Sequence, residues 1–390
     1  MLNLPAAVLF VSGITGLAMT FILITVAKSY PKYIHGVAEW ANATLLASIA
    51  MFLLLGRGHI ADFFSIIMAN LLLMLAFIQM HSANRLLAEQ KPWLVKGKLY
   101  ALLISFAGFY LWFTYISPSM PARLLVLAVY LLPILIEQFI FTCKHFEPSS
   151  GKTVLLVSLG FVIIGRSLRV ISMLNGVELP TDLFENTLTN IVSVAIPALT
   201  IPLSTVSCIM LASERLHRNL DYASRHDDLT DVLNKKTITE VLQQEIKRTK
   251  RLKNHLSIML LDLDNFKNIN DQYGHLMGDK VLINFAKKSK GLFRDTDYLA
   301  RFGGDEFIAV LPDTSVEQAQ IIANRINVAG KFSDPQWSVS IGIAGFIESD
   351  TFETILSRAD DALYQAKFSG KNQTHIAQPL NQTNALGSNG

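Results

Sequence analysis

Residues 298–312 of the chain read YLARFGGDEFIAVLP. Two apolar, β-prone runs flank the pair Gly303 and Gly304, which predicts a β-hairpin whose tip uses the backbone freedom of glycine. The carboxylates Asp305 and Glu306 follow directly. Side chains of a strand point alternately to opposite faces, so one carboxylate can face a ligand at the tip while its neighbour turns away. On these residues alone, a ligand site and a solvated turn both remain open.

A second informative stretch, LSIMLLDLDNF, covers residues 256–266. Its continuous apolar run is typical of a central, buried strand, and it ends in Asp262 and Asp264, which lie on the same face. If the hairpin pairs beside this strand, Asp262 and Asp305 come together. A divalent cation would resolve their repulsion, and Mg²⁺ prefers oxygen ligands of this kind, completed by water and phosphate. The sequence therefore predicts a magnesium site that also takes a phosphate-bearing substrate.

Basic residues follow the predicted strand, lie beside the hairpin or end the last helix, where they are expected to lie near these carboxylates in the fold. They are Lys267, Arg301, Lys367 and Lys371. Each one alone would be read as a solvated surface charge. Their common location favours phosphate clamps, because metal-bridged phosphate held by Lys and Arg is the usual equipment of phosphoryl and nucleotidyl transfer.

The region after residue 226 has the composition and size of an ordinary globular domain. The expected order is a turn at 227–234, helix 236–252, strand 256–263, a turn and one helix at 265–292, hairpin 297–312, helix 315–329, strand 336–346 and helix 352–368. Strands alternating with helices around one antiparallel hairpin predict an α/β fold with helices packed on a mixed sheet. The Asn-, Gln- and Ser-rich tail 376–390 is expected to be disordered.

The region before residue 212 holds most of the hydrophobic residues, which make up 51% of the chain. Seven apolar runs there have the length of a membrane-spanning helix: 4–27, 37–55, 60–79, 99–117, 123–141, 153–174 and 191–212. A single run could be a buried core helix, but seven in succession with short polar loops predict an all-α, multi-pass membrane bundle. The polar stretch 212–226 is expected to continue the seventh helix as a linker. The predicted domains are thus 1–211, 212–226, 227–375 and the tail 376–390.

The loops between these runs indicate the orientation. With the N-terminus outside, the cytoplasmic loops hold Lys28, Lys32, Arg85, Lys91, Lys96, Lys98, Lys144 and Lys152, whereas the outer loops hold only Arg57 and Arg123. The loop 175–190 has no Lys or Arg and carries Glu178, Asp182 and Glu185. The excess of Lys and Arg on one side predicts insertion in the inner (cell) membrane, with the C-terminal half in the cytoplasm.

Arg166 and Arg169 lie inside the sixth run, three residues apart and therefore on one helical face. Ionisable residues at this depth usually face the bundle interior or a water-filled cavity. One hypothesis is a pocket for an anionic or polar signal. The alternatives are a structural pair with Glu137 and snorkelling of the side chains towards the interface.

Together, the motifs in the second half resemble those of the GGDEF domain, the catalytic domain of diguanylate cyclases. The resemblance covers about 227–372 and rests on DDLTDVLN, DLDNFKNINDQYGHLMGD, RDTDYLARFGGDEF, SVSIGIA and ADDALYQAKFSGKN, in that order. It implies a nucleotidyl-cyclase or polymerase-palm-like fold with helices on both faces of the sheet. It also implies condensation of two GTP molecules into cyclic di-GMP and pyrophosphate by a homodimer that binds no nucleic acid.

By motif position, the resemblance also implies residue roles. Asp262, the carbonyl of Leu263, Asp305 and Glu306 correspond to ligands of Mg²⁺, or of Mn²⁺ in its place, and Asp305 and Glu306 to the catalytic carboxylates. Asn270 and Asp279 correspond to the guanine-binding positions, and His275, Lys267, Arg301, Lys367 and Lys371 to further substrate contacts. Arg294 and Asp297 match the RxxD signature of product inhibition, with Arg325 as a candidate partner in the next helix.

The chain departs from the family pattern at a few positions. Asp231 and the pair Lys235 and Lys236 stand where the family usually shows Gly and Arg-Arg, and Lys371 stands where Arg is usual. Lysine offers a point charge in place of a bidentate clamp, so weaker GTP binding is expected at Lys371.

Three functions compete on the sequence alone. The first is a membrane-bound diguanylate cyclase. The second is a non-catalytic membrane receptor for GTP or cyclic di-GMP, against which the intact carboxylates Asp262, Asp305 and Glu306 argue. The third is a transporter or seven-helix receptor with an incidental tail, which leaves those carboxylates without a role.

Overall fold

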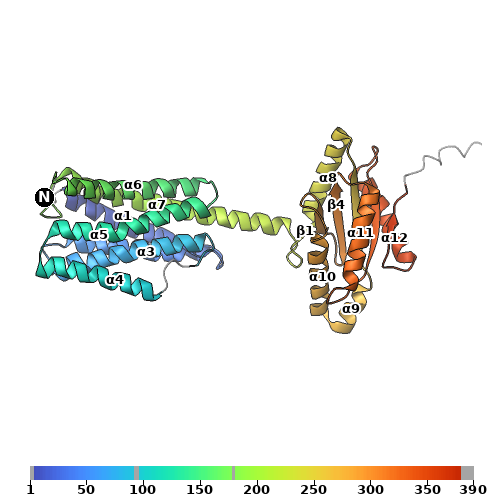
Figure 1. Cartoon of the computed structure of the whole chain (residues 1–390), viewed down its shortest axis with the longest axis horizontal. Coiled ribbons are helices and arrows are strands. Elements are labelled where there is room, and N and C mark those ends of the chain that lie inside the picture. The colour runs from blue at the N-terminus through green and yellow to red at the C-terminus, as the bar shows by residue number, and fades with distance from the viewer. Residues whose placement is uncertain (1–3, 92–95, 178–180, 379–390) are drawn as a thin grey trace, which may run out of the picture. The chain divides into compact units, whose positions relative to one another are not determined.

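The computed structural model describes residues 4–91, 96–177 and 181–378. The chain divides into two compact units, Met1–Arg218 and Asn219–Gly390 (Figure 1). Each unit has its own hydrophobic core and is described by itself. Glu178 and residues 379–390 of the expected disordered tail lie outside the described residues.

The first unit is all-helical. Its elements are α1 (Leu4–Ser29), α2 (Val37–Leu55), a π-helical turn η1 (Phe63–Met68) that continues as α3 (Ala69–Leu87), α4 (Lys96–Leu111) that ends in a second π-helical turn η2 (Trp112–Ile116), α5 (Met120–His145), α6 (Ser150–Leu174) and α7 (Leu188–Arg225). Seven helices in the described residues are long and apolar enough to cross a membrane. The predicted all-α bundle is confirmed, and α7 runs on as one helix to Arg225.

The bundle is apolar outside and partly polar inside. Phe21 and Ile104 are each 72% exposed, whereas Thr44 and Ser48 are buried. Several buried hydroxyls bond to the carbonyl four residues earlier in their own helix, as Thr44 does to Trp40 and Ser48 to Thr44. This is the arrangement that lipid demands, because apolar side chains can face hydrocarbon while polar groups are satisfied internally.

Glu137 of α5 lies inside the bundle and pairs with two basic side chains. Its carboxylate contacts the Nε2 atom of His81 and lies 3.6 Å from Nη1 of Arg85. These partners come from α3, so the suggestion that Arg166 pairs with Glu137 is wrong. Arg166 lies instead beside a cavity, together with Arg169.

The second unit is a mixed six-stranded sheet with helices on both faces. Its elements are β1 (Leu233–Asn234), α8 (Lys235–Leu252), β2 (Leu256–Leu263), α9 (Phe266–Tyr273), α10 (His275–Lys290), β3 (Tyr298–Arg301), β4 (Glu306–Pro312), α11 (Val316–Lys331), β5 (Val339–Gly345), α12 (Phe352–Phe368) and β6 (Thr374–Ile376). The strand order is β1-β3-β4-β2-β5-β6. The predicted fold class, the hairpin and the central position of β2 are confirmed.

The alternation of side chains along β2 builds two cores. Met259 and Leu261 pack into the core on the side of α10 and α11, whereas Ile258 and Leu260 pack into the core on the side of α8 and α12. All eight residues of β2 are buried, which explains the unbroken apolar run in its sequence. Asp262 belongs to the second set and therefore faces the side of α12.

Side-chain caps fix where several helices begin. Asn234 accepts a hydrogen bond from the backbone N–H of Thr237 at the start of α8 (3.0 Å). Ser315 and Thr351 cap α11 and α12 in the same way. Such caps satisfy N–H groups that lack a partner in the first turn.

The structure differs from the sequence prediction at three places in this unit. The single helix expected at 265–292 is two helices, because Gly274 between them has a φ of 80°, a left-handed value that interrupts the helix. Leu233 and Asn234, expected in a turn, form β1 beside β3. β6 pairs with β5 and includes Ile376, the first residue of the expected disordered tail, because its backbone completes the edge of the sheet.

Gly342 of β5 lies under α12 at a point of close approach. A Cβ atom there would lie 2.2 Å from the carbonyl oxygen of Ala359 and 2.3 Å from the backbone nitrogen of Leu363. Both neighbours are backbone atoms of a packed helix, so they cannot move aside without shifting α12.

We expect Gly342→Ala to lower the free energy of unfolding of the second unit by about 1–3 kcal/mol, the usual cost of overpacking a core. The measurement is urea unfolding of a 219–390 fragment followed by the fluorescence of Trp337, the only tryptophan after residue 218. Gly291→Ala is the matched control, because a Cβ there meets nothing closer than 3.5 Å. An unchanged unfolding midpoint for Gly342→Ala would contradict this close packing.

Candidate functional site

The site lies where β2 ends and the hairpin turns. Antiparallel pairing of β2 with β4 sets Asp262 directly opposite Glu306, so the two residues share one face of the sheet. The backbone N–H of Leu263 donates to the carbonyl of Asp305 (3.3 Å), which extends this pairing by one residue. The structure therefore brings the predicted carboxylates Asp262, Asp305 and Glu306 to one end of two neighbouring strands.

The carboxylate of Asp262 is nearly buried, with its side chain 12% exposed, and it is paired with a lysine. Nζ of Lys367, from the last turn of α12, lies 2.7 Å from Oδ2 of Asp262. Burial raises the pKa of Asp262; the hydrogen bond and charge of Lys367 oppose this rise, and the neighbouring carboxylates Asp305 and Glu306 add to it. The pKa of Asp262 is raised overall, so additional positive charge beside this carboxylate would stabilise its ionised form.

The hairpin turn is closed by backbone hydrogen bonds to Glu306. The N–H groups of Phe302 and Gly303 both donate to the Glu306 carbonyl, at 2.8 and 3.1 Å. A Cβ atom at Gly303 would lie 2.8 Å from Oε2 of Glu306, so the side chain of Glu306 folds back over this glycine. A residue with a side chain at 303 would compete for that space.

Arg301 braces this turn. Its Nε and Nη2 atoms donate to the carbonyl of Gly304, at 3.0 and 2.7 Å, and Nη1 lies 3.3 Å from Oδ1 of Asp227. By motif position, Arg301 is expected to contact substrate. In the structure its guanidinium group is engaged with the protein, on the turn and on Asp227.

Asp227 opens the motif DDLTDVLN, whose sequence predicts no role for it. Its Oδ1 atom accepts from the N–H and the hydroxyl of Thr230, at 2.9 and 2.7 Å, as well as from Arg301. Burial by itself would raise the pKa of Asp227, but the hydrogen bonds from Thr230 and the charge of Arg301 hold that pKa below its ordinary value of 3.8. The only sequence signal for this contact is the Asp-x-x-Thr spacing, typical of a side-chain-capped turn.

A cleft of about 390 Å³ opens beside Glu306, between the hairpin and α12. Its wall is mostly apolar, with acidic groups at the edge. The lining residues are Leu260, Leu261, Phe302, Glu306, Phe307, Phe352, Glu353, Leu356, Ser357, Asp360 and Leu363. The sequence alone does not reveal this cleft, because its walls come from strands and a helix that are distant in the chain.

Asn270 and Asp279, the predicted guanine-binding pair, come from α9 and α10. Gly278 allows the two helices to approach, since a Cβ atom there would lie 2.0 Å from Oδ1 of Asn270. This contact sets the amide of Asn270 against the backbone immediately before Asp279. Lys267 and His275, in the same two helices, are exposed.

Lys371 and Asp264 tie the segment after α12 to the end of β2. Nζ of Lys371 donates to Oδ1 of Asn265 (2.6 Å), and the backbone N–H of Asn372 donates to Oδ2 of Asp264 (2.9 Å). The hydroxyl of Ser340 on β5 donates to Oδ1 of Asp264 (2.6 Å). Asp264 is thus a structural anchor that positions Lys371 beside the site.

Arg294 and Asp297 lie together in a turn before β3, where the Arg294 N–H donates to Oδ2 of Asp297 (2.9 Å). A cavity of about 280 Å³ adjoins them. Its lining residues are His226, Asp231, Val232, Leu233, Lys290, Phe293, Arg294, Asp295, Asp297, Tyr298 and Leu299. Arg325, the third predicted member of this site, is exposed on α11 and does not line that cavity.

The residues at the strand ends fit a hard divalent cation by their chemistry. Asp262, Asp305 and the carbonyl of Leu263 are oxygen donors, which Mg²⁺ prefers, and the raised pKa of Asp262 marks a shortage of positive charge. Among residues 4–91, 96–177 and 181–378, no cluster of three or more His, Cys, Asp or Glu side chains is arranged to hold a metal ion. A cation here would therefore need a substrate phosphate or water to complete its shell.

Comparison with known proteins places the second unit in a family. Residues 224–373 match the family described as diguanylate cyclase, GGDEF domain. Diguanylate cyclase DgcP of Pseudomonas aeruginosa is 39% identical over 158 residues, which are 39% of this chain and 24% of that protein. Diguanylate cyclase DgcM of Escherichia coli is 35% identical over 168 residues, which are 42% of this chain and 41% of that protein.

Among solved structures, the GGDEF domain of DgcB from Caulobacter crescentus in complex with c-di-GMP is 25% identical to this chain. The match covers 40% of this chain and 97% of that one, with a TM-score of 0.39.

Residues 224–373 of this chain are therefore a GGDEF domain, as the motifs indicated. The matches span less than half the length of the two relatives, 24% and 41%.

The contact between Arg301 and Asp227 predicts a pH-dependent stability. Because the pKa of Asp227 is lowered in the folded unit, its contribution is complete above the ordinary value of 3.8 and is lost as the pH falls through the lowered value. We expect the difference in free energy of unfolding between the wild-type unit and Asp227→Asn to be constant above about pH 5 and to shrink below that ordinary value.

The measurement is urea unfolding of both 219–390 fragments at a series of pH values. Asp361→Asn serves as the control, because Asp361 is exposed on α12 and its carboxylate makes no ion pair within the described residues. A difference that stays constant between pH 5 and 3 would show that the Asp227 carboxylate does not act through its charge.

Proposed function

We propose that this protein is a membrane-bound diguanylate cyclase, which condenses two GTP molecules into cyclic di-GMP and two pyrophosphates. The observation that carries the proposal is the register that sets Asp262 opposite Glu306, with Asp305 beside them, inside a GGDEF domain. A receptor that only binds nucleotide has no need of three carboxylates at one end of two strands.

Mg²⁺, or Mn²⁺ in its place, would be held by Asp262, the carbonyl of Leu263 and Asp305, with Glu306 as a further ligand or as the group that assists deprotonation of the attacking hydroxyl. When bound, the ion would neutralise phosphate charge in the transition state. Lys367 is already within 2.7 Å of Asp262 and would be available to substrate phosphate once a cation takes over this carboxylate.

Other residues of the domain would orient GTP. Asn270 and Asp279 would read the guanine edge, with His275 as a further contact from the same stretch. Lys267 and Lys371 would contact phosphate. Arg301 would act through the hairpin turn, whose shape it fixes by its two hydrogen bonds to Gly304.

Each domain would bind one GTP, so the product would form between two domains that face each other in a homodimer. The orientation follows from the excess of Lys and Arg in alternate loops: the N-terminus would lie outside the inner membrane and the GGDEF domain in the cytoplasm. The helical linker 212–226 would connect the membrane region 1–211 with the catalytic domain 227–375.

The purified full-length protein, incubated with GTP and Mg²⁺, should produce cyclic di-GMP, and EDTA should stop the reaction. Asp305→Asn and Glu306→Gln should each lower the rate by about 100-fold or more, because each removes a charge used in the transition state. Chromatographic detection of cyclic di-GMP measures the product. GTP binding without any product, at protein concentrations that favour dimers, would support the receptor alternative instead.

Asp313→Asn and Glu348→Gln are the matched controls for this assay. They make the same chemical changes at exposed positions outside the site, so they should retain wild-type turnover. A loss of activity in these controls that equals the loss in Asp305→Asn would contradict the assignment of the carboxylates.

Product inhibition should depend on Arg294 and Asp297. We expect Arg294→Ala to retain turnover and to raise the concentration of cyclic di-GMP that halves the rate by about tenfold, since a guanidinium–phosphate pair of hydrogen bonds is lost. Initial rates at increasing added product measure this effect. Arg251→Ala, at another exposed arginine of the domain, should leave inhibition unchanged.

A further inference from the structure

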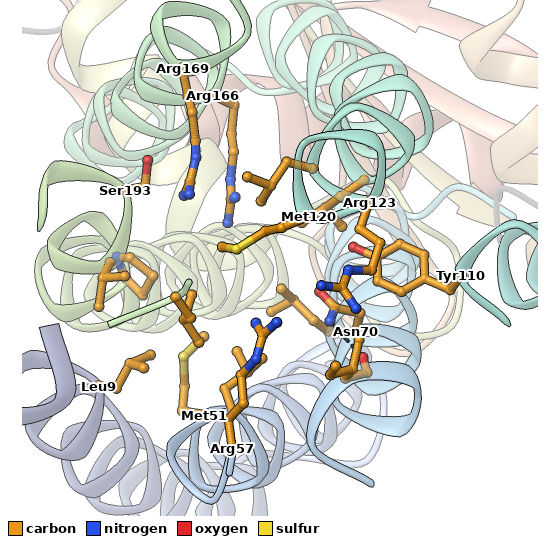
Figure 2. A pocket seen from close by; sticks show the side chains of 18 residues that line it. Leu9, Met51, Arg57, Asn70, Tyr110, Met120, Arg123, Arg166, Arg169 and Ser193 are labelled. Atoms are coloured by element: carbon orange, nitrogen blue, oxygen red, sulfur yellow. Dashed lines mark hydrogen bonds between the residues drawn. The ribbon is translucent and has the colours of Figure 1, made fainter. Parts of the chain in front are cut away.

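One end of the helical unit holds a cavity of about 70 Å³ that is lined by four arginines. Arg57 follows α2, Arg123 lies in the first turn of α5, and Arg166 and Arg169 lie in the second half of α6. Figure 2 shows the four guanidinium groups pointing into the same space, two of them from α6. Among the described residues that line it, the cavity has no Asp or Glu.

Two of the arginines are held by the protein. Nη2 of Arg169 donates to Oδ1 of Asn190 (2.6 Å), and Nδ2 of Asn190 in turn donates to three backbone carbonyls of the loop before α7. Nε of Arg57 lies 3.9 Å from Oδ1 of Asp182, whose side chain is 57% exposed. Arg169 is thus fixed in place, and Arg57 has one weak, solvated counter-charge.

The other two arginines face the cavity with less support. No hydrogen bond or ion pair joins Arg123 or Arg166 to another residue within the described parts of the chain. Asp62 attracts Arg123 electrostatically without forming an ion pair. The carboxylate of Glu137 is engaged by His81 and Arg85.

Arg169 is buried and the other three arginines are partly buried, so the gathering of four positive charges at one cavity is costly unless an anion is present. A guanidinium group in the low-dielectric interior of a membrane bundle needs a hydrogen-bonded counter-charge. Snorkelling does not supply one, because Arg166 and Arg169 point into the cavity instead of along the lipid-facing surface (Figure 2). Arginine presents its donors as a planar fork, which matches the oxygens of a carboxylate or phosphate.

A second cavity, of about 60 Å³, adjoins the first and is apolar. Both cavities are lined by Met51, Leu73, Arg166 and Pro197. The remaining walls of the second are mostly aliphatic or aromatic, for example Ala76, Phe77 and Leu159. Arg166 therefore stands at the junction between a cationic space and an apolar one.

We propose that these two cavities form one binding site for an amphiphilic anion, a molecule with a carboxylate or phosphate head and an alkyl chain. The arginines hold the head, and the chain enters the apolar cavity past Met51 and Pro197. Neither a free inorganic anion nor an uncharged alkyl molecule uses both spaces.

The test is binding to the purified full-length protein in lipid nanodiscs, read as the shift in thermal unfolding with ligand concentration. The ligands are decanoate, acetate and decanol, with decyl phosphate and inorganic phosphate as a second series. Decanoate or decyl phosphate should bind at least about tenfold more tightly than the head group or the alcohol alone, since each of these lacks one half of the contacts. The better of the two heads identifies carboxylate or phosphate as the natural one.

Variants locate the site. Arg166→Gln and Arg123→Gln should each weaken binding of the preferred amphiphile by about tenfold or more, the effect of losing a charge-assisted hydrogen bond. Ala76→Leu, which fills the apolar cavity, should weaken the decyl ligand and leave the short acid unchanged. Arg218→Gln is the matched control, because Arg218 is 51% exposed and does not line either cavity.

Acetate binding as tightly as decanoate, decanol binding as tightly as decanoate, or full binding in Arg166→Gln would each overturn the proposal. The comparison among ligands on the wild-type protein does not depend on any variant folding. Because the readout is binding, its outcome is independent of whether the GGDEF domain makes cyclic di-GMP.

Discussion

The antiparallel pairing of β2 with β4 is the constraint on which the second unit depends. Its register sets Asp262 opposite Glu306 and, through the alternation of side chains, assigns every apolar residue of β2 to one of two cores. A slip by one residue would exchange these faces, so that each apolar side chain of β2 would enter the opposite core and Asp262 would turn away from the side of α12. The packing of both faces therefore protects the geometry of the carboxylates, which by themselves repel and would otherwise separate.

The sequence predicted most of this fold because its signals are local. The run 258–261 is apolar without interruption, and Gly303 and Gly304 mark the hairpin tip. The helices of the first unit are long and apolar enough to cross a membrane. The differences have two causes, one local and one that depends on a distant strand. The sequence predicts one helix across Gly274, whose positive φ in fact divides it into two. β6 is not predicted, because its three residues form a strand only by pairing with the edge of β5. Short edge strands depend on their partners more than on their own composition.

Part of the candidate site could be predicted from the sequence, and part could not. The carboxylates could be predicted, since they end a recognisable strand and a recognisable turn. The engagement of Arg301 with Asp227 and of Lys367 with Asp262 could not, because each joins residues that are 74 or about 100 positions apart. In the helical unit, the spacing of Arg166 and Arg169 within one apolar run marks them as unusual. Arg57 and Arg123 have the sequence context of loop residues, and only the packing of the helices brings them to the same cavity.

Pro197 lines both cavities of the helical unit and lies inside α7, the helix that continues to Arg225. Proline has no N–H, so the carbonyl four residues earlier, that of Ser193, lacks its helical donor, and Pro202 repeats this defect at Ala198. A helix that lacks two backbone hydrogen bonds in neighbouring turns bends more easily there than elsewhere. A molecule in these cavities would therefore touch α7 at a turn where the helix lacks a hydrogen bond.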